Sequence, residues 1–579
     1  MTSKDLPTRD TAITERYTDA QFATWMKHQQ LSNHQTTKTA WHSFAKDCIT
    51  LHFLDEHIIS CMACDVCIRG PENNDPPFAL YNDVHPPSQF IVVTCLDASL
   101  RITATTASPK SRSVSKIPSL ISGSSESSSF FFSPTKLHTT SPTTLTSDTP
   151  TVESATYLLT IISIMAQPFY ELKCTTNQYP WGNVGKDSLS ATLCAKQPGY
   201  GDDGPKSDFK LQEDKPYAEM WMGTYPVLPS YVAKTGEDLQ DVIDKYPNEL
   251  VGEQMLKKFG HSKVPYLPKV LSIAKALPLQ VHPNKDLSAK LHKENPDDFT
   301  DPNHKPEIAL ALSKFEAFCG FKPTEQIASL MKLDCLRKFL PENGESNFTK
   351  ETVKKVVRNM LTADDDSLAS TYEALTSTSP SSFGLDSYIP KLAPRLASQY
   401  EKKDPGVLVA LITMNFLTLN PGEAIYIPAD GIHAYLSGDI IECMARSNNV
   451  LNTGFCPKAE RASADLFVST LTFSPNDKEQ CMLRPQPYKG CKSGKTEILA
   501  PPMSEFDMLQ MTLGAGEQET LEKIGGNGVL LATKGSSTMT ANGLKTELNE
   551  GQVYFIAPNV ELKFEAGKDG LLMHQAYCH

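Results

Sequence analysis

Short apolar runs separated by turn residues recur along most of this chain. The clearest are "YLPKVLSIAKALPLQVHP" and "KPEIALALSKFEAFCGF"; the pattern returns with "VLVALITMNFLTLNPGEAIYIP" and continues to the C-terminus. Apolar runs of about four to eight residues that are bounded by Pro and Gly predict buried strands. The pattern therefore predicts a mainly β protein.

The spacing of apolar positions changes between about residues 323 and 405. In "PTEQIASLMKLDCLRKFL" and "KETVKKVVRNML" apolar residues recur every three or four positions, which predicts helices. Pro405 and Gly406 predict the end of this helical stretch. The predicted segments are an N-terminal extension (1–164), a first β region (165–322), a helical insert (323–405), a second β region (406–480) and a C-terminal β domain (481–579).

The first 164 residues differ in composition from the rest. The stretch from about 99 to 156 is rich in Ser and Thr and buries too little apolar surface to offset chain entropy, which predicts disorder. Cys61, Cys64 and Cys67 have a spacing that suits zinc or an iron–sulfur cluster, but no clear fourth ligand follows. Compact sequence begins at Met165, which could be the true start, so we expect residues 1–164 to be either a mispredicted or a dispensable extension.

Composition excludes several classes of protein. The net charge of −12 and the lack of a basic aromatic stripe argue against nucleic-acid binding. No apolar run approaches the roughly 18 to 20 residues of a membrane span. The N-terminus lacks a secretory signal, and the 14 cysteines are expected to be reduced thiols, which suits the cytoplasm.

Two segments of the β regions resemble each other. "PGEAIYIPADGIH" (421–433) and "EGQVYFIAPNVELKF" (550–564) each place a glycine before an apolar strand and a proline after it. The pattern resembles the second motif of the cupin superfamily, which implies two cupin-like jelly-roll β-barrel regions beside an α-helical domain. In that motif a histidine after the proline binds metal. His433 takes this place in the first copy; the second copy has no such histidine, and we expect it to lack metal.

The stretch "LSIAKALPLQVHPNKDL" places Gln280 and His282 two residues apart. On a strand, residues i and i+2 share a face. The two side chains are therefore either buried polar groups with partners or half of a metal site. Glu307 and His433 would complete such a site. Two His nitrogens and a carboxylate suit zinc, although an amide oxygen is an unusual zinc ligand, and a single buried His is more often simply hydrogen-bonded.

Several blocks together resemble type I mannose-6-phosphate isomerase. They are "NQYPWG", "KPYAEMWMGTYP", "LPKVLSIAKALPLQVHPNKDL", "NHKPEIALAL", "FCGF", "PGEAIYIPADGIHAYLSGDIIECMA" and "GFCPK". The resemblance implies one zinc ion per chain. Its implied ligands are Gln280, His282, Glu307 and His433.

The resemblance also implies an activity: interconversion of mannose 6-phosphate and fructose 6-phosphate by proton transfer between C1 and C2 through a cis-enediol. This would supply mannose for GDP-mannose synthesis and glycosylation. The implied catalytic residues are His304, Lys305, Glu442 and, at a position discussed next, Asn452. The implied substrate-binding residues are Trp181, Glu219, Lys269, Tyr435 and Lys458. The expected partner is a sugar phosphate, and the expected state is a monomer.

One block departs from the family pattern. Many members have S-D-N-x-x-R-A-G-x-T-P-K where this chain has "SNNVLNTGFCPK", so Asn452 stands at the position of an arginine. Asparagine supplies neither the charge nor the fork of donors that arginine has. One hypothesis is that Arg446 takes over this role. The alternatives to an active isomerase are a catalytically impaired cupin paralogue that binds sugar phosphate, and an isomerase of another sugar phosphate.

Overall fold

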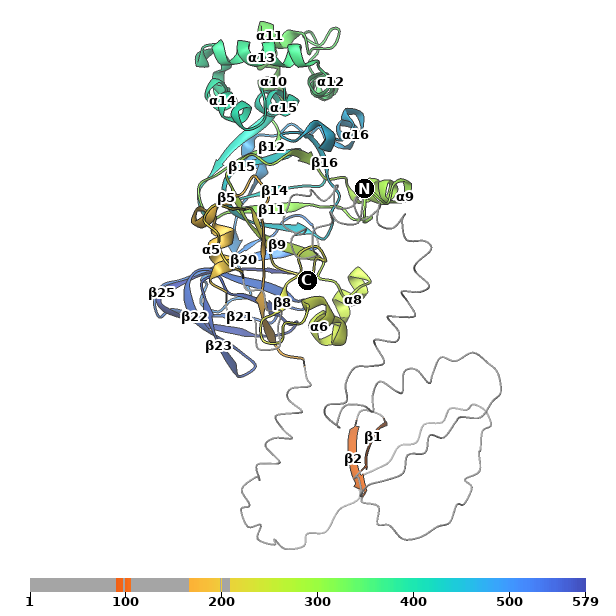
Figure 1. Cartoon of the computed structure of the whole chain (residues 1–579), viewed down its shortest axis with the longest axis vertical. Coiled ribbons are helices and arrows are strands. Elements are labelled where there is room, and N and C mark those ends of the chain that lie inside the picture. Colours follow the sequence, from red (N-terminus) through yellow and green to blue (C-terminus); the bar gives the residue numbers. More distant parts are fainter. Residues whose placement is uncertain (1–89, 97–98, 106–165, 198, 200–208, 504) are drawn as a thin grey trace, which may run out of the picture. The chain divides into compact units, whose positions relative to one another are not determined.

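The computed structural model describes residues 90–96, 99–105, 166–197, 199, 209–503 and 505–579 (Figure 1). The chain divides into two units, residues 1–142 and 143–579, and each is described by itself. In the first unit, β1 (Phe90–Leu96) and β2 (Ser99–Thr105) form an antiparallel pair. The cysteine triplet and the rest of the predicted extension lie outside the described residues.

The second unit is rich in sheet and also contains helices. Its strands are β3 (Phe169–Lys173), β4 (Thr176–Asn177), β5 (Asn183–Val184), β6 (Pro216–Tyr217), β7 (Glu219–Trp221), β8 (Tyr231–Val232), β9 (Tyr266–Ile273), β10 (Leu279–Val281), β11 (Glu307–Ala311), β12 (Phe315–Phe321), β13 (Met414–Leu419), β14 (Ala424–Ile427), β15 (His433–Ala445), β16 (Leu451–Gly454), β17 (Met482–Leu483), β18 (Gln486–Pro487), β19 (Thr496–Leu499), β20 (Asp507–Leu513), β21 (Gln518–Leu521), β22 (Gly528–Ala541), β23 (Leu544–Asn549), β24 (Val553–Ile556) and β25 (Leu562–Tyr577). Its α-helices are α5 (Leu189–Ala195), α6 (Leu239–Lys245), α7 (Pro247–Leu250), α8 (Glu253–Phe259), α9 (Lys285–Glu294), α10 (Thr324–Leu330), α11 (Asp334–Arg337), α12 (Lys350–Leu361), α13 (Asp365–Ser377), α14 (Ile389–Gln399), α15 (Pro405–Thr413) and α16 (Ala464–Thr470). Short 3₁₀ helices are η1 (Gly185–Asp187), η2 (Pro380–Asp386), η3 (Lys458–Glu460) and η4 (Lys478–Cys481).

The long strand β15 organises the first large sheet. Its N-terminal half pairs with β10 and β12, and its C-terminal half pairs with β9 and β11. Gly438, with φ of 112°, lies where the partners change. An apolar cluster fills the space between these two sets of strands; it includes Leu271 and Ala309 on one side and Phe315 and Leu417 on the other. Side chains at the end of this space can therefore converge from both sets of strands.

The second large sheet has the order β18-β19-β20-β25-β22-β24-β3-β8. Strands β3 and β8 come from the start of the unit, yet they extend a sheet that is built mainly from C-terminal strands. Tyr170 and Phe555, almost four hundred residues apart in sequence, are direct neighbours in this register. The two ends of the unit are therefore fixed together by strand pairing.

Helices α10 to α15 lie together at one end of the unit (Figure 1). In the sequence they come between β12 and β13, two strands of the first large sheet. The prediction that "VLVALIT" forms a strand is wrong, because these residues belong to α15. Pro405 does not end the helices but occupies the first turn of α15, and the Asp404 side chain accepts a hydrogen bond from the Gly406 amide at 2.8 Å. Every residue of α15 is buried, so its sequence has no polar face to reveal a helical period.

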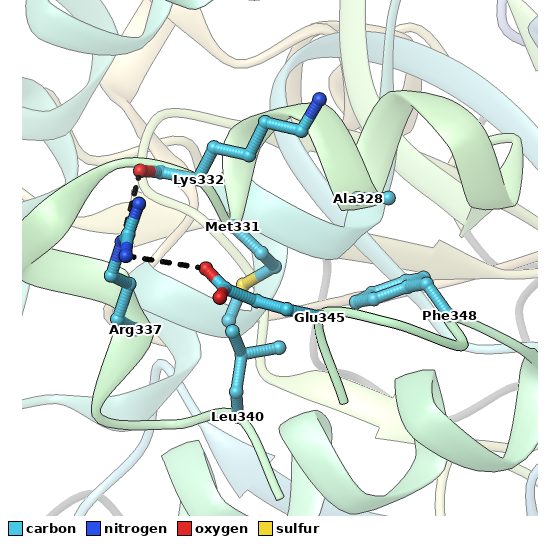
Figure 2. A pocket seen from close by; sticks show the side chains of 7 residues that line it. All are labelled: Ala328, Met331, Lys332, Arg337, Leu340, Glu345 and Phe348. Carbon is cyan, nitrogen blue, oxygen red and sulfur yellow. Dashed lines mark hydrogen bonds and ion pairs between the residues drawn. The ribbon is translucent and has the colours of Figure 1, made fainter. Parts of the chain in front are cut away.

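The helical region has a hollow of about 310 Å³ that is lined by both apolar and charged side chains (Figure 2). Its lining residues are Ala328, Met331, Lys332, Arg337, Leu340, Glu345 and Phe348. None of the residues predicted for metal or substrate lines it. Among the helices of the described residues, none has both the length and the apolar character needed to cross a bilayer.

Candidate active site

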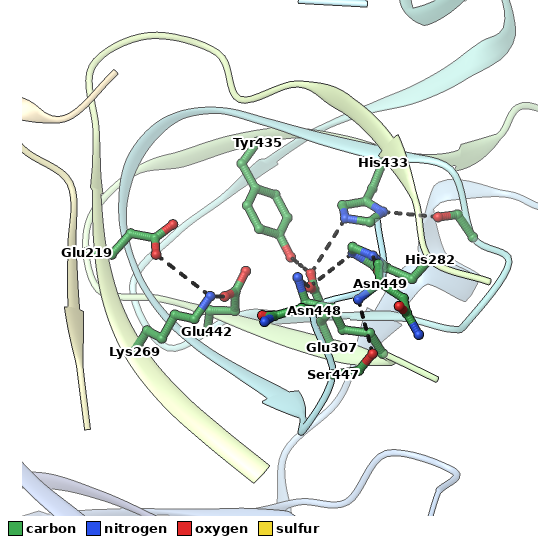
Figure 3. A network of polar contacts seen from close by, with 12 residues as sticks. Glu219, Lys269, His282, Glu307, His433, Tyr435, Glu442, Ser447, Asn448 and Asn449 are labelled. Atoms are coloured by element: carbon green, nitrogen blue, oxygen red, sulfur yellow. Dashed lines mark hydrogen bonds and ion pairs between the residues drawn. The ribbon is translucent and has the colours of Figure 1, made fainter. Parts of the chain in front are cut away.

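Three predicted metal ligands converge in the interior of the first sheet (Figure 3). Glu307 begins β11, His433 begins β15, and His282 directly follows β10. All three side chains are buried, and one ligand atom from each lies within 4.8 Å of the others. His282 Nε2 is 3.2 Å from Glu307 Oε1, and His433 Nε2 is 3.5 Å from Glu307 Oε2. One carboxylate thus faces two imidazoles.

The other nitrogen of each imidazole fixes its orientation. His282 Nδ1 donates to the Asn449 carbonyl at 2.8 Å, and His433 Nδ1 donates to the Gly431 carbonyl at 3.0 Å. Both Nε2 atoms are buried and have no hydrogen-bond partner among the described residues. Burial lowers the pKa of both histidines, that of His433 to about 4, so both are neutral near pH 7. Two neutral nitrogens and a carboxylate oxygen are a donor set that suits zinc, and the site therefore fits a metal ion.

Gln280 lies beside this group on the sheet. It is the direct cross-strand partner of His433 in the β10–β15 pair. Directly opposed residues of an antiparallel pair have Cβ atoms about 4.5–5.5 Å apart and share a face. The period of two also puts Gln280 on the face of His282. Backbone register thus brings the fourth predicted ligand to the edge of the cluster.

A second buried group lies next to the first (Figure 3). Lys269 Nζ is 2.9 Å from Glu442 Oε2 and 3.7 Å from Glu219 Oε2. Trp221 Nε1 donates to Glu219 Oε2 at 2.6 Å, and its ring lies under the Lys269 ammonium at 5.0 Å. Cross-strand register explains the grouping, since Lys269 opposes Glu442 on β15 and Trp221 on β7.

Burial dominates the electrostatics of this second group. It raises the pKa of Glu442 to about 7, against the lowering effect of Lys269. Burial alone would lower the pKa of Lys269, but Glu219 and Glu442 outweigh it and the pKa is raised. The lysine therefore stays charged, while Glu442 can exchange a proton near neutral pH.

Tyr435 and Lys305 border the metal ligands. The Tyr435 hydroxyl donates to Glu307 Oε2 at 3.1 Å, and Lys305 Nζ is 3.5 Å from Glu307 Oε1. His304 points elsewhere, because its Nε2 lies 2.6 Å from Glu505 Oε1 in the segment before β20. Of these three residues, Tyr435 and Lys305 are in contact with the carboxylate that the histidines share.

The remaining predicted residues lie in other surroundings. Trp181 packs against the apolar cluster between the two sets of strands. Lys458 is largely exposed and pairs with Asp365, the first residue of α13, at 3.1 Å. The Arg446 guanidinium donates to Thr224, to Oγ1 at 3.0 Å and to the carbonyl at 2.9 Å.

Arg446 also lies over the Tyr225 ring at 4.6 Å, and that ring contacts Trp221 edge to face. The Arg446 guanidinium thus donates to Thr224, next to the aromatic residues that border the second group. Asn452 lies on β16, directly opposite Gln280, and its Oδ1 is buried without a hydrogen-bond partner among the described residues.

Sequence reasoning missed the residues that hold the ligands in place. The side-chain amide of Asn449 donates to the backbone carbonyls of Asp301 and Asn303, at 2.7 and 2.9 Å. Ser447 Oγ donates to the Asn303 carbonyl at 3.0 Å. These bonds join the loop before Glu307 to the loop whose carbonyl orients His282. The signal in the sequence was the polar run "SNN" after an apolar strand, a composition that favours local side chain to backbone bonds.

The fold and the site together define a sheet protein with a buried His-Glu-His metal site beside a buried lysine–carboxylate group. The family model for the phosphomannose isomerase type I catalytic domain matches residues 169–324. The mannose-6-phosphate isomerase of Schizosaccharomyces pombe is 37% identical over 425 residues, which cover 71% of this chain and 99% of that protein. The Saccharomyces cerevisiae enzyme is 34% identical over 439 residues, with the same coverage of 71% and 99%.

Solved structures agree with these relatives. A zinc-bound crystal structure of mannose 6-phosphate isomerase has 25% identity and a TM-score of 0.58, and covers 71% of this chain and 100% of that chain. A variant of phosphomannose isomerase from Salmonella typhimurium has 26% identity and a TM-score of 0.59, with the same coverage of 71% and 100%. This chain belongs to the type I mannose-6-phosphate isomerase family.

Proposed function

We propose that this chain binds one zinc ion and interconverts mannose 6-phosphate and fructose 6-phosphate. The observation that carries the proposal is the pair of buried Nε2 atoms, on His282 and His433, that face one carboxylate and have no hydrogen-bond partner among the described residues. The curated relatives carry the name of this activity, and one similar crystal structure contains zinc.

Gln280, His282, Glu307 and His433 would hold the zinc ion. When bound, zinc acts as a Lewis acid that stabilises negative charge developing on sugar oxygens. The protein's own contribution is to hold the imidazoles in the required tautomer, through the carbonyls of Asn449 and Gly431.

Glu442 is our candidate for the base. It would take the proton from C2 of the open-chain aldose and deliver it to C1, while the O2 hydroxyl loses a proton and O1 gains one; the intermediate is the cis-enediol. A base with a pKa near the working pH is the most effective, and burial raises the pKa of Glu442 to about 7. Lys269, at 2.9 Å, stabilises its ionised form.

Lys305 is the candidate for proton exchange at the sugar oxygens, because its amine lies 3.5 Å from Glu307 Oε1. His304 would have to leave its bond to Glu505 to take part. The Asn452 amide neither gains nor loses a proton near neutral pH, so it is not a candidate for this step.

The finer parts of the expectation belong to the same proposal. They are two cupin-like jelly-roll regions, with the helical insert extended to the end of α15 at Thr413, substrate contacts from Trp181, Glu219, Lys269, Tyr435 and Lys458, a monomeric state, and a supply of mannose 6-phosphate for GDP-mannose synthesis. The ion-paired Glu219–Lys269–Glu442 group, which lies beside the metal ligands in Figure 3, supports the contacts from Glu219 and Lys269 best.

The test uses the full chain. We would remove metal with a chelator, restore zinc, and follow formation of fructose 6-phosphate from mannose 6-phosphate. Turnover that disappears with the metal and returns with zinc is expected. Zinc binding without turnover would instead favour the alternative of a protein that binds sugar phosphate without isomerising it. The neutral Asn452 and the engaged donors of Arg446 are the observations that favour that alternative.

A further inference from the structure

Three side chains form a row across neighbouring strands in the first sheet. Gln280 on β10 opposes His433 on one side and Asn452 on the other. Because direct partners in antiparallel pairs share a face, Asn452 lies on the face that carries the metal ligands. The β10–β16 register shifts at this point, since Gln280 pairs with Asn452 but Leu279 pairs with Gly454. This irregularity leaves Thr453 out of the ladder, and such bulges re-aim neighbouring side chains.

The chemistry of an amide ligand explains why Asn452 is of interest. A glutamine that gives its Oε1 to a metal ion keeps an NH₂ group with two donors. Unless that group is held, the amide can turn and present nitrogen to the metal. Asn452 Oδ1 is a buried acceptor with no hydrogen-bond partner among the described residues, on the strand directly beside Gln280. Buried acceptors without partners are rare and call for an explanation.

The strand that carries Asn452 is firmly held. The Phe455 amide donates to both oxygens of Asp404 at 3.0 Å, which ties the end of β16 to the start of α15. Gly454 packs so closely on Gly406 that a Cβ at Gly454 would lie 2.4 Å from the Gly406 Cα. The Asn452 carbonyl accepts from the Ala462 amide at 2.7 Å. A residue on such a strand can fix the orientation of its neighbour.

We propose that Asn452 is a positioning residue: when the metal ion binds, the Asn452 Oδ1 atom, which has no hydrogen-bond partner among the described residues, accepts a hydrogen bond from the Gln280 side-chain amide and so directs Gln280 Oε1 toward the metal. This inference rests on the proposed zinc site. It gives a role to the position at which this chain departs from the family's arginine. It also predicts that Asn452 affects zinc binding, and that it does so through Gln280.

The test is a double-mutant cycle read out as zinc affinity, measured by competition with a chromophoric chelator. The proteins are the wild-type chain, Asn452→Leu, Gln280→Ala and the double variant. Loss of a residue that orients a metal ligand typically costs about 10- to 100-fold in affinity. We therefore expect Asn452→Leu to weaken zinc binding about tenfold or more in the wild-type background, and to have no further effect once Gln280 is alanine.

Thr453→Val is the matched control. Thr453 is the next residue on the same strand, and its buried hydroxyl also lacks a hydrogen-bond partner among the described residues, but it lies outside the ladder with Gln280. We expect this variant to keep wild-type zinc affinity. Melting temperatures of the metal-free proteins would show whether each variant is folded.

Two results would overturn the inference. One is an unchanged zinc affinity in Asn452→Leu. The other is an equal loss with and without Gln280, which would mean that Asn452 acts by another route. A change in KM for the sugar phosphate with unchanged zinc affinity would assign Asn452 to the substrate instead. Failure of the proposed function looks different, because the wild-type chain would then bind no zinc or would bind it without isomerising.

Discussion

Both large sheets contain a glycine–strand–proline segment, but among the described residues only the first sheet carries the candidate metal site. In the first sheet Gly422, with φ of 88°, precedes the four-residue strand β14, and Pro428 follows it. In the second, Gly551, with φ of 90°, precedes the four-residue strand β24, and Pro558 follows. The likeness seen in the sequence is thus a likeness of backbone conformation as well.

The difference lies in how each sheet treats its buried histidine. His433 donates through Nδ1 to a carbonyl and leaves Nε2 facing Glu307. In the second sheet, His574 is also buried, but its Nδ1 lies 3.3 Å from Thr533 Oγ1 and its Nε2 lies 3.2 Å from Gln510 Oε1. A buried histidine is therefore not itself a sign of a metal site. The informative feature is a nitrogen without a hydrogen-bond partner that faces a carboxylate.

Replacing the buried histidine of each sheet by glutamine should affect different properties of the protein. We expect His433→Gln to lose most of its zinc and at least about 10³-fold in kcat/KM, since a metal that stabilises charge contributes several kcal/mol to a transition state. His574→Gln should keep full zinc content and activity, and lose about 1 kcal/mol of stability from an altered hydrogen bond. Zinc content by atomic emission and the isomerase assay measure the two effects. Loss of zinc in His574→Gln would show that the second sheet contributes to metal binding.

Buried carboxylates offer a second comparison. Glu442 pairs with Lys269, whereas Glu519 in the second sheet accepts backbone amide hydrogen bonds, among them those of Ser493 at 2.7 Å and Lys495 at 2.8 Å. We expect Glu442→Gln to lower kcat about 10²-fold or more, because it removes the candidate base. Glu519→Gln should leave kcat unchanged and cost about 1.5–3 kcal/mol of stability, because charge-assisted bonds are lost. Equal kcat values for the two variants would remove Glu442 from the mechanism.

The acid side of the pH profile tests the same assignment. A base must be ionised to accept a proton, and burial raises the pKa of Glu442 to about 7. Activity should therefore be full above that pH and fall as the pH drops below it, up to tenfold per unit. Measurements of kcat/KM between about pH 5 and 9, with zinc content followed at each pH, would show this. The residual activity of Glu442→Gln should lack this fall; if the fall persists, another group is responsible for it.

Part of the site follows from local sequence rules. The two-residue period of a strand puts Gln280 and His282 on one face, whereas His433 is indicated by the resemblance of the glycine–strand–proline pattern to the cupin motif. The contact between the two histidines and Glu307 does not follow, because it depends on strands that are distant in sequence and bend around an apolar cluster. The orienting carbonyl of Asn449 could not be predicted either, since backbone groups leave no signature in side-chain chemistry.

The fold shows the same limit. Strand periodicity predicted a sheet-rich chain with helices, but it misassigned α15, whose uniform burial removes any polar face. It also gave no sign that β3 pairs with β24, a contact between the first and last parts of the unit. Local patterns specify elements, whereas long-range pairing is decided by packing of the whole chain.

The smallest expected effect is a difference in the stability lost when Gly422 and Gly551 are each replaced by alanine. It distinguishes backbone strain, which both share, from crowding, which only Gly551 should show. Both have φ near 90°, where a side chain costs about 1–2 kcal/mol. At Gly422 the nearest atom to an added Cβ would be Gln510 Nε2, at 3.9 Å. Gly422→Ala should therefore lose stability through backbone strain and not through crowding. At Gly551 it would lie 2.5 Å from the Leu193 carbonyl oxygen and 2.8 Å from Lys196 Cβ.

We therefore expect Gly551→Ala to lose at least about 1 kcal/mol more stability than Gly422→Ala, as overpacking commonly costs about 1–3 kcal/mol. Urea unfolding of the two variants side by side measures the difference. Equal losses would mean that α5, which carries Leu193, can move away from β24 without penalty. In that case the segments around β14 and β24 would tolerate an added side chain equally well, as they already share a backbone conformation. The difference between the two sheets would then lie in the surroundings of their histidines.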